Sequence, residues 1–585
     1  MKASDYVVEF LIQHKITDIF GYPGGMVTHF MDSLDKYRMQ ISAHLNYHEQ
    51  ACAMAACGWA EMTGLPGVAY ATSGPGATNL LTGIACAYFD SLPCIFITGQ
   101  VNTYEQKENL RVRQKGFQET DIVSMAQPIT KQAVMVRNAS ELPELLETLY
   151  RVSMEGRRGP VLVDIPMNVW REDIEKPLPL WDQPLQPAIP PVEIATGILH
   201  ELQKAHRPVI LAGHGVTLSG SREYFRAFVE QTGIPTVTSM IAVDVLPSKS
   251  AYCYGMIGAY GNRWSNYLVN HSDCILSLGS RLDSRQTGTC RDMFAPTAKL
   301  LRVDIDRSEL EHRVNDWETH YEVLLEELLP VLLEKSKQII WKFHDWQHCC
   351  MKIYSKLKYA DRLETASLFV EKLGELCPDG VVITTDVGQN QVWVAQSLEV
   401  KENQRILFSG GHGAMGYSLP AAIGAAIATK HPIICVTGDG GLQMNIQELQ
   451  TVVREHLPIK IILLNNRALG MIHHFQEMYF DSNFVQTDDS AGFTVPDFIG
   501  IAKAYGIRAM RYTNEISLKS ILADADPAFI EVALPQTTRL VPKLGLNKPI
   551  HEQEPPLSEK LQNEISTILK YKSREQSCLP REEML

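Results

Sequence analysis

Two polar turns stand one strand–helix–strand repeat apart in residues 437–470. Gly-Asp-Gly (438–440) follows the apolar run IICVT, and Asn-Asn (465–466) follows IKIILL. Successive parallel strands deliver such turns to one edge of a sheet, where ligands bind and glycines let a phosphate approach the backbone. A carboxylate and an amide oxygen are hard donors that suit Mg²⁺. The spacing of Asp439 and Asn466 therefore predicts a magnesium and phosphate site.

Each turn alone has a simpler interpretation, because Gly-Asp-Gly also caps helices and Asn-Asn is common in loops. Residues 410–416, GGHGAMG, contain G-x-G-x-x-G between RILFS and a helical stretch, which is the outline of a dinucleotide site. Asp439 falls where a ribose-binding acid would lie. The preceding strand is short, and the Asp–Asn pair already accounts for the acid, so the magnesium and phosphate site is favoured over an NAD site.

Three series of apolar strands must position these turns. Examples are CIFITGQ and VLVDIP, then CILSLGSR and LLRVDID, then VVITTDVG and FIEVAL, with helical stretches between them. Continuous apolar strands in this order indicate parallel sheets covered on both faces. We expect an α/β protein with three doubly wound parallel-sheet domains at 1–172, 190–340 and 365–545. Six prolines in residues 172–192 indicate an extended linker, and a polar tail (546–585) is expected to wrap the surface with little core of its own.

Composition excludes several classes of protein. The chain is 45% hydrophobic and 21% charged, as expected for a globular protein, and its formal net charge of −13 argues against nucleic-acid binding. No apolar run approaches the roughly 20 residues of a membrane span, and the polar N-terminus does not resemble a signal peptide. The 12 cysteines include no C-x-x-C pair, which indicates reduced thiols and a cytoplasmic protein.

Motifs along nearly the whole chain resemble those of thiamine diphosphate (ThDP)-dependent enzymes, and most closely those of acetolactate synthase (acetohydroxyacid synthase) large subunits. The resemblance implies a pyrimidine-binding N-terminal domain, a central FAD-type domain and a diphosphate-binding C-terminal domain. The matching stretches are FGYPGG (20–25), YHEQACAMAACGWAEMTGLPGVAYATSGPGATN (47–79), GFQETD (116–121), GPVLVDIP (159–166), GSRLDSRQTG (279–288), TDVGQNQVW (385–393) and GHGAMGYSLPAAIGA (411–425).

The resemblance implies roles for the matching residues. Glu49 resembles the glutamate that hydrogen-bonds the aminopyrimidine ring of ThDP and promotes loss of the thiazolium proton. Met415 resembles the apolar residue that supports the bent cofactor, and Asp439, Asn466 and the carbonyl of Ala468 resemble the Mg²⁺ ligands. Further cofactor-binding positions are implied at Gly388, Gln389, Asn390, Gly413, Gly440, Gly441, Gly470 and Met471, and further catalytic positions at Phe117 and Gln118.

The central domain resembles the FAD-binding domain of acetolactate synthase, with Gly213, Arg281 and Asp304 at matching positions. The resemblance implies FAD without a redox step, although many relatives keep this fold and lack the flavin. It also implies a homodimer or homotetramer, because the family pairs the N-terminal domain of one subunit with the C-terminal domain of another. A regulatory subunit is left open.

Departures from the family concern the second substrate. Phe475 stands where a tryptophan usually favours 2-ketobutyrate, Met167 stands where lysine is usual, and Leu282 and Ser284 replace Phe and Asp. The tail resembles that of relatives encoded with surface-polysaccharide genes, which are reported to transfer a two-carbon unit to a keto-sugar. The acceptor is therefore expected to be a 2-keto acid or a keto-sugar.

These features predict a ThDP- and Mg²⁺-dependent carboligase, an acetolactate synthase-like transferase. It would decarboxylate pyruvate and pass the two-carbon unit to a second carbonyl compound. The alternative is a flavin-linked pyruvate oxidase or decarboxylase. A non-catalytic scaffold is disfavoured because Glu49, Asp439 and Asn466 are intact. The His473-His474 pair is interpreted as part of a helix at the rim of the pocket.

Overall fold

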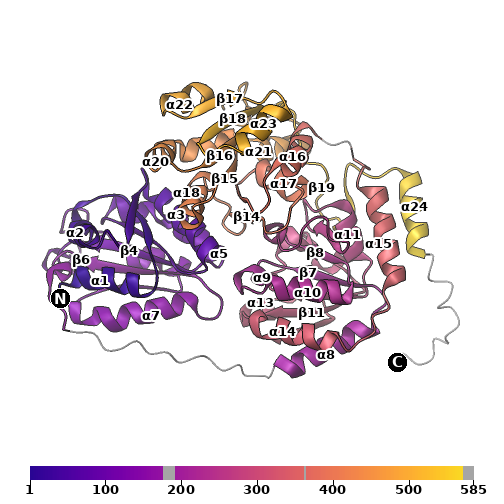
Figure 1. The fold of residues 1–585 in the computed structure, drawn as a ribbon, viewed down its shortest axis with the longest axis horizontal. Coiled ribbons are helices and arrows are strands. Elements are labelled where there is room, and N and C mark those ends of the chain that lie inside the picture. Colours follow the sequence, from indigo (N-terminus) through magenta and orange to yellow (C-terminus); the bar gives the residue numbers. More distant parts are fainter. Residues whose placement is uncertain (176–190, 362–363, 571–585) are drawn as a thin grey trace. The chain divides into compact units, whose positions relative to one another are not determined.

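The computed structural model describes residues 1–175, 191–361 and 364–570. Within them the chain forms three six-stranded sheets, and every strand pair in these sheets is parallel. This confirms the predicted α/β class (Figure 1). Most of the predicted linker and the last part of the predicted tail lie outside the described residues.

The first sheet has the strand order β2-β1-β3-β4-β6-β5. Its central strands β4 and β6 are buried at every residue, because helices cover both faces, and this is why their sequences read as continuous apolar runs. The strands are β1 (Asp18–Gly21), β2 (Ser42–Leu45), β3 (Gly67–Ala71), β4 (Cys94–Gln100), β5 (Gln132–Met135) and β6 (Pro160–Pro166).

The second sheet has the order β12-β11-β10-β7-β8-β9. The chain runs outward from β7 to β9 and then returns to β10 on the other side of β7, so the direction of strand addition reverses between β7 and β10. The strands are β7 (Pro208–Ala212), β8 (Thr236–Thr238), β9 (Cys253–Met256), β10 (Cys274–Leu278), β11 (Lys299–Asp304) and β12 (Glu318–Glu322).

The third sheet has the order β14-β13-β15-β16-β18-β17, with its reversal between β13 and β15. In open parallel sheets, ligands bind where the loops after two such strands diverge. The strands are β13 (Val382–Thr385), β14 (Arg405–Leu407), β15 (Ile433–Gly438), β16 (Ile459–Asn465), β17 (Arg508–Arg511) and β18 (Ala528–Ala533).

The described chain separates into two compact units. The first holds the first and third sheets, and the second holds the second sheet together with residues 538–570. In the first unit, helix α3 (Glu49–Thr63) packs closely on α18 (Ser418–Thr429). A Cβ atom added to Gly58 would lie 2.2 Å from the carbonyl oxygen of Ala421, so glycine is required for this approach.

The segment after residue 540 contributes more core than the sequence indicated. Ile550 and Ile565 are buried in one apolar cluster of the second unit. Helix α24 (Glu559–Lys570) packs on α15 (His344–Leu357), and Lys356 Nζ lies 2.6 Å from Glu564 Oε2. The buried positions are isolated in a polar sequence, so no periodic apolar pattern marks them.

The described cysteines are free thiols, and most of them are buried, which agrees with the expectation from their spacing. Across the described ranges, no helix combines the length and the apolar character needed to cross a membrane.

Candidate active site

Asp439 and Asn466 lie at adjacent strand ends in the third sheet. Asp439 begins α19 (Asp439–Met444) directly after β15, and Asn466 directly follows β16, the neighbouring strand. Asp439 is buried, and its Oδ1 atom accepts a hydrogen bond from the Gly440 N–H at 2.6 Å. Its Oδ2 atom is buried and has no hydrogen-bond partner within the described residues. The side-chain amide nitrogen of Asn466 donates a hydrogen bond to Gln389 Oε1 at 3.0 Å. The side-chain oxygen of Asn466 is therefore the atom that could bind a metal ion.

The electrostatics of Asp439 fit a bound cation. Burial raises the pKa of Asp439 to about 6, although the hydrogen bond from Gly440 and the nearby backbone N–H groups of residues 466–468 oppose the rise. A divalent cation at Oδ2 would satisfy the unpaired oxygen and favour the charged form. One carboxylate, one amide oxygen and one backbone carbonyl are the hard donor set that Mg²⁺ takes beside phosphate and water. The residues present therefore fit Mg²⁺.

Glycines bring four separate stretches of the chain to this point. A Cβ atom added to Gly440 would lie 3.0 Å from Cε of Met415, and one added to Gly470 would lie 1.9 Å from Oε1 of Gln389. One added to Gly438 would lie 2.5 Å from Nδ2 of Asn390. The turns at 388–390, 413–415, 438–441 and 466–470 thus meet at the reversal point of the sheet.

Two of these turns adopt backbone conformations that favour glycine. Gly388 has φ +132° and Gly413 has φ +71°, and an added Cβ at either position would have no neighbour closer than 3.5 Å. Glycine at these positions is therefore required by the backbone conformation and leaves open space beside it. Such open space beside a glycine turn lets a diphosphate group approach the backbone.

Asp386 supports the same turns and was not predicted. It follows β13, is fully buried, and accepts hydrogen bonds from Gly416 N–H at 2.9 Å and from Ser418 Oγ at 2.6 Å. A Cβ atom added to Gly441 would lie 2.5 Å from its Oδ1 atom. Burial raises the pKa of Asp386, and its hydrogen bonds oppose that rise. Its position at the end of an apolar strand in VVITTDVG is the signal that could have identified it.

Phe475 lies on helix α21 (Gly470–Tyr479), which directly follows the turn that contains Asn466 and Ala468. Its side chain is 42% exposed, and its ring centroid lies 4.8 Å from that of Tyr479. Met471 is half-buried on the same helix. A partly exposed aromatic ring therefore lies on the helix that follows the turn at 466–470.

His473 faces a loop instead of open space. Its Nε2 atom lies 3.2 Å from Asp488 Oδ2, and its ring stacks on Phe484 with centroids 3.9 Å apart. Asp488 pairs with Ala468 in an isolated β-bridge. Gln476, one turn along the helix, accepts a hydrogen bond from Thr487 Oγ1 at 2.8 Å. These contacts explain His473 as a residue that holds the 484–488 loop against α21 and Ala468.

Glu49 lies in the domain of the first sheet, at the first position of α3. It is buried, and its Oε2 atom accepts a hydrogen bond from Asn79 Nδ2 at 2.9 Å. A Cβ atom added to Gly76 would lie 3.1 Å from Glu49 Oε1. The preceding residue, His48, caps the helix by accepting the Gln50 N–H at its Nδ1 atom. The carboxylate is therefore held in a defined position.

Phe117 and Gln118 lie in a loop close to this helix start. A Cβ atom added to Gly74 would lie 2.9 Å from Cβ of Gln118, so the loop touches the turn that also approaches Glu49. Phe117 is 79% exposed. The loop is fixed by Glu119, whose carboxylate accepts N–H groups from Lys107 at 2.6 Å and from Lys115 at 2.8 Å. Glu49 and Gln118 thus share one neighbourhood, whereas Asp439 and its neighbours form a second group in the third-sheet domain.

The predicted flavin residues lie at neighbouring strand ends of the second sheet. Gly213 follows β7, Arg281 follows β10, and Asp304 ends β11. A Cβ atom added to Gly213 would lie 2.1 Å from the carbonyl oxygen of Gly279, so this glycine is required by the contact of two turns. Arg281 Nη2 lies 3.2 Å from Asp283 Oδ2. Gly213 and Arg281 stand on the two sides of the reversal point, where a nucleotide would bind.

A cavity of about 410 Å³ lies elsewhere in the second unit, beneath the C-terminal segment. Its lining includes Tyr267, His271, His551 and Gln553, and none of the predicted flavin residues. It is therefore separate from the predicted flavin site.

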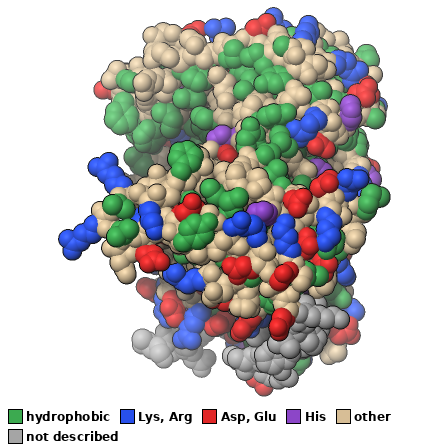
Figure 2. All heavy atoms as spheres, turned by 90° about the vertical axis from the view of Figure 1, so that its left-hand side faces the viewer, with side chains coloured by type: hydrophobic (Ala, Val, Ile, Leu, Met, Phe, Trp, Pro, Cys, Tyr) green, Lys and Arg blue, Asp and Glu red, His purple; other side chains and the backbone are tan. Residues whose placement is uncertain are grey.

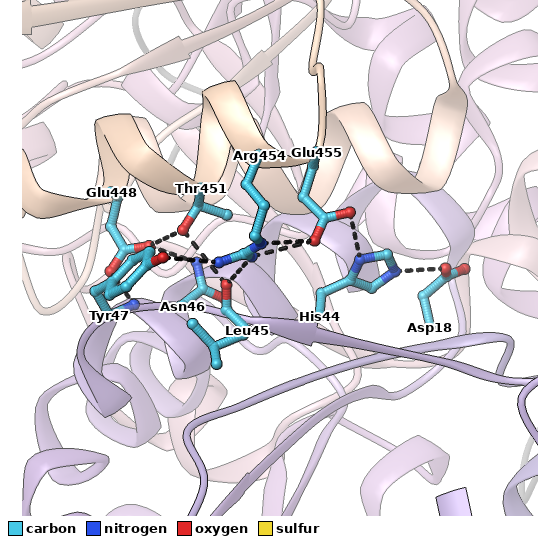
Figure 3. Close-up of polar contacts among 9 residues, drawn as sticks. All are labelled: Asp18, His44, Leu45, Asn46, Tyr47, Glu448, Thr451, Arg454 and Glu455. Carbon is cyan, nitrogen blue, oxygen red and sulfur yellow. Dashed lines mark hydrogen bonds and ion pairs between the residues drawn. The ribbon is translucent and has the colours of Figure 1, made fainter. Parts of the chain in front are cut away.

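A polar network joins the two domains of the first unit near Glu49. His44 on β2 lies with Nε2 2.9 Å from Asp18 Oδ1 and with Nδ1 3.5 Å from Glu455 Oε2 (Figure 3). Arg454 Nη2 lies 3.1 Å from Glu455 Oε1, and Arg454 Nη1 donates to Tyr47 Oη at 3.3 Å. Burial alone would lower the pKa of His44, but the hydrogen bonds and negative charges of Asp18 and Glu455 outweigh it and raise the pKa to about 9.

His44 should make the stability of this unit depend on pH. Its pKa of about 9 in the fold, against 6.5 in the unfolded chain, corresponds to about 3 kcal/mol of stabilisation. This contribution is fully present below pH 6.5 and is lost as pH rises through about 9. Urea unfolding of the parent and of His44→Gln, at about pH 6 and about pH 9.5, should show a gap in stability that closes at the higher pH. An equal gap at both pH values would contradict the assignment.

Large hydrophobic side chains are exposed on the first unit, and Figure 2 shows such side chains lying close together on one face. Several belong to the loops and helices that carry predicted site residues. They are Tyr104, Leu110, Val112 and Phe117 in the first-sheet domain, and Met444, Ile472, Phe475, Phe480 and Val485 in the third-sheet domain.

Three family models match the chain in the order of its three sheets. They describe the N-terminal TPP-binding domain of thiamine pyrophosphate enzymes (residues 1–125), the central domain (196–323) and the C-terminal TPP-binding domain (386–532).

Curated relatives match along almost their full length. The acetolactate synthase isozyme 2 large subunit of Escherichia coli is 33% identical over 93% of this chain and 97% of its own. A probable acetolactate synthase large subunit of Methanocaldococcus jannaschii is 34% identical over 91% of this chain and 92% of its own. Chloroplastic acetolactate synthase 2 of Nicotiana tabacum is 33% identical over 93% and 83%. The chain belongs to the family of thiamine pyrophosphate (thiamine diphosphate)-dependent enzymes, as a relative of the acetolactate synthases.

Proposed function

We propose that the chain is a carboligase that decarboxylates pyruvate and transfers the two-carbon unit to a second carbonyl compound. The observation that carries the proposal is the meeting of Asp439, Asn466, Gln389 and Met415 at the reversal point of the third sheet. When bound there, ThDP would supply the electron sink for decarboxylation. The similarity to acetolactate synthases supports ligation over simple decarboxylation.

In the proposed reaction, residues of the chain bind the cofactor and orient the substrates. Asp439, Asn466 and the Ala468 carbonyl would hold Mg²⁺, and the backbone at Gly388 and Gly413 would face the diphosphate. Met415 packs beside Gly440 and would support the cofactor. Glu49 would hold a proton at the aminopyrimidine nitrogen. Phe117, Gln118 and Phe475 would exclude water and contact the second substrate.

We propose that each active site is completed by two subunits of a homodimer or homotetramer. Glu49 and Asp439 make their own contacts in separate domains, and both domains expose hydrophobic side chains on the segments that carry predicted site residues. The proposed domain limits are 1–172, 190–340 and 365–545, and each contains the corresponding family match. FAD is proposed for the second sheet, at Gly213, Arg281 and Asp304.

One assay distinguishes the candidate reactions. Purified protein is supplied with pyruvate, ThDP and Mg²⁺, and CO₂ release, oxygen uptake and products are measured. Acetolactate, or a longer ligation product when an aldehyde or keto-sugar is added, without oxygen uptake would support the carboligase. Acetate or acetyl phosphate with oxygen uptake would indicate the flavin-linked oxidase. Absence of CO₂ release would overturn both.

Phe475 should set the choice of acceptor. Tryptophan offers a wider face than phenylalanine, and one methyl contact in a pocket is worth about 1–3 kcal/mol of discrimination. We expect little preference of the parent for 2-ketobutyrate over pyruvate, and a rise of about tenfold or more in Phe475→Trp. Competition between the two acceptors, with products measured by mass spectrometry, checks this.

Phe480→Trp is the matched control, because its exposed ring lies just beyond the helix, with its centroid 6.0 Å from that of Phe475. The control should leave acceptor ratios unchanged. A strong preference of the parent for 2-ketobutyrate, or unchanged acceptor ratios in Phe475→Trp, would show that Phe475 does not line the acceptor pocket.

A further inference from the structure

We propose that Glu448 is a positioning residue that fixes the location of Glu49, and this rests on the role proposed above for Glu49. Glu448 ends the short helix η8 (Ile446–Glu448) on the crossover that begins at Asp439. Glu49 begins α3 in the first-sheet domain. The two residues belong to different domains of the same compact unit.

The Glu448 carboxylate holds the loop that leads into α3. Its Oε1 atom accepts the Tyr47 N–H at 2.8 Å, and its Oε2 atom accepts Asn46 Nδ2 at 2.9 Å (Figure 3). Thr451 Oγ1, one turn further along its own segment, donates to Oε2 at 2.8 Å. The side chain of Glu448 is completely buried, and burial raises its pKa. Three donors therefore converge on one buried carboxyl group.

Such an arrangement restrains the backbone strongly. A buried carboxylate is costly unless hydrogen bonds satisfy it, and hydrogen bonds to a charged group are among the stronger ones in proteins. Two of the three donors belong to consecutive residues between β2 and α3. His48 and Glu49 follow at once, so the position of the helix start is determined from the other domain.

Glu448 affects the position of Glu49 indirectly. The Glu49 carboxylate is bonded by Asn79, within its own domain, whereas Glu448 acts on the backbone two residues earlier. Glu49 is thus restrained both at its side chain and at the backbone that precedes it. Displacing a reacting group by about 1 Å can cost about 100-fold in rate, so loss of the backbone restraint should reduce turnover.

A purely structural role makes a different prediction, and the chain offers a matched control. Glu61, at the other end of α3, lies with Oε2 3.1 Å from Arg405 Nη2 and also joins the two domains. If Glu448 only held the domains together, Glu448→Gln and Glu61→Gln would lower the stability of the protein to a similar extent. Neither substitution would then change the loop at 45–50 more than the rest of the unit.

The first measurement uses the apoprotein. Hydrogen–deuterium exchange of the backbone amides in residues 45–50 should be about tenfold or more faster in Glu448→Gln and unchanged in Glu61→Gln. Asn46→Ala removes one of the three donors and should give a smaller increase in exchange. It replaces Glu448→Gln in this experiment if Glu448→Gln does not fold. Unchanged exchange in these variants would overturn the proposal.

The second measurement is a double-mutant cycle on pyruvate decarboxylation. Glu448→Gln should lower kcat by about 10- to 100-fold with KM for pyruvate within about threefold, and should have no further effect in a Glu49→Gln background. Multiplicative losses would show that Glu448 does not act through Glu49. If Glu49→Gln alone left turnover unchanged, the proposed role of Glu49 would fail, and the exchange experiment would still decide whether Glu448 holds the loop.

Discussion

Replacing Glu49 with glutamine is expected to slow CO₂ release from pyruvate by about 100- to 10,000-fold, the usual contribution of a positioned general acid–base group. Glutamine has nearly the same shape and can keep a hydrogen bond to Asn79, but it cannot exchange a proton with the aminopyrimidine nitrogen. ThDP binding should stay within about tenfold of the parent, because the substitution removes no volume. Steady-state kinetics and a ThDP titration of the apoprotein measure the two quantities.

Proton exchange at the thiazolium carbon gives an independent readout of the same step. It should be slow in Glu49→Gln and as fast as in the parent in Glu61→Gln, where the same substitution is made at the far end of α3. Parent-like turnover and parent-like exchange in Glu49→Gln would remove Glu49 from its assigned role.

The central strands of the three sheets could be predicted from the sequence, and several edge strands could not. Strands such as β4 and β16 are buried on both faces, so they read as uninterrupted apolar runs. Edge strands β12 and β17 carry charged and partly exposed residues, and β8 has only three residues. Their pairing is determined by the neighbouring strand, so local sequence carries little signal for it.

Part of the candidate site could likewise be predicted from the sequence, and part could not. The spacing of Asp439 and Asn466 indicated a shared sheet edge, and the structure places both residues at adjacent strand ends. Asp386 and Glu448 escaped prediction because each acts on backbone groups far away in sequence. A single buried acid gives no pattern until its partners are known. In the structure, both residues are identified by the burial of their carboxylates and by the hydrogen bonds that these carboxylates accept.

Departures from the family also acquire a physical meaning. Leu282 is buried in an apolar cluster of the second unit, so its replacement of phenylalanine is a matter of core packing. His473 is held by Asp488 and Phe484 against a loop. Phe475 is partly exposed on the helix that follows the turn at 466–470, so it is the departure for which we propose a role in substrate choice.

Asp439 is the residue on which cofactor binding should depend most. Its Oδ2 atom is buried and unpaired within the described residues, in a turn where side chains at 438, 440 and 441 would collide with their neighbours. Removing even a supporting partner of a metal ligand typically costs about 10- to 100-fold in affinity, so losing the only carboxylate of the set should cost about 100-fold or more. Asp439→Ala should therefore weaken ThDP binding in the presence of Mg²⁺ by at least that factor.

The informative quantity is the ratio of ThDP affinities measured with Mg²⁺ and with a chelator, by titration of the apoprotein. This ratio should be large in the parent and close to one in Asp439→Ala, because the variant cannot use the metal to offset the diphosphate charge. Asp488→Asn is the control: it changes another buried carboxylate beside Ala468, and it should keep the parent's ratio. Apo Asp439→Ala should be at least as stable as the parent, since a buried carboxylate with an unpaired oxygen has been removed. A variant that binds ThDP with the parent's dependence on Mg²⁺ would show that the metal lies elsewhere and that the two polar turns do not form its site.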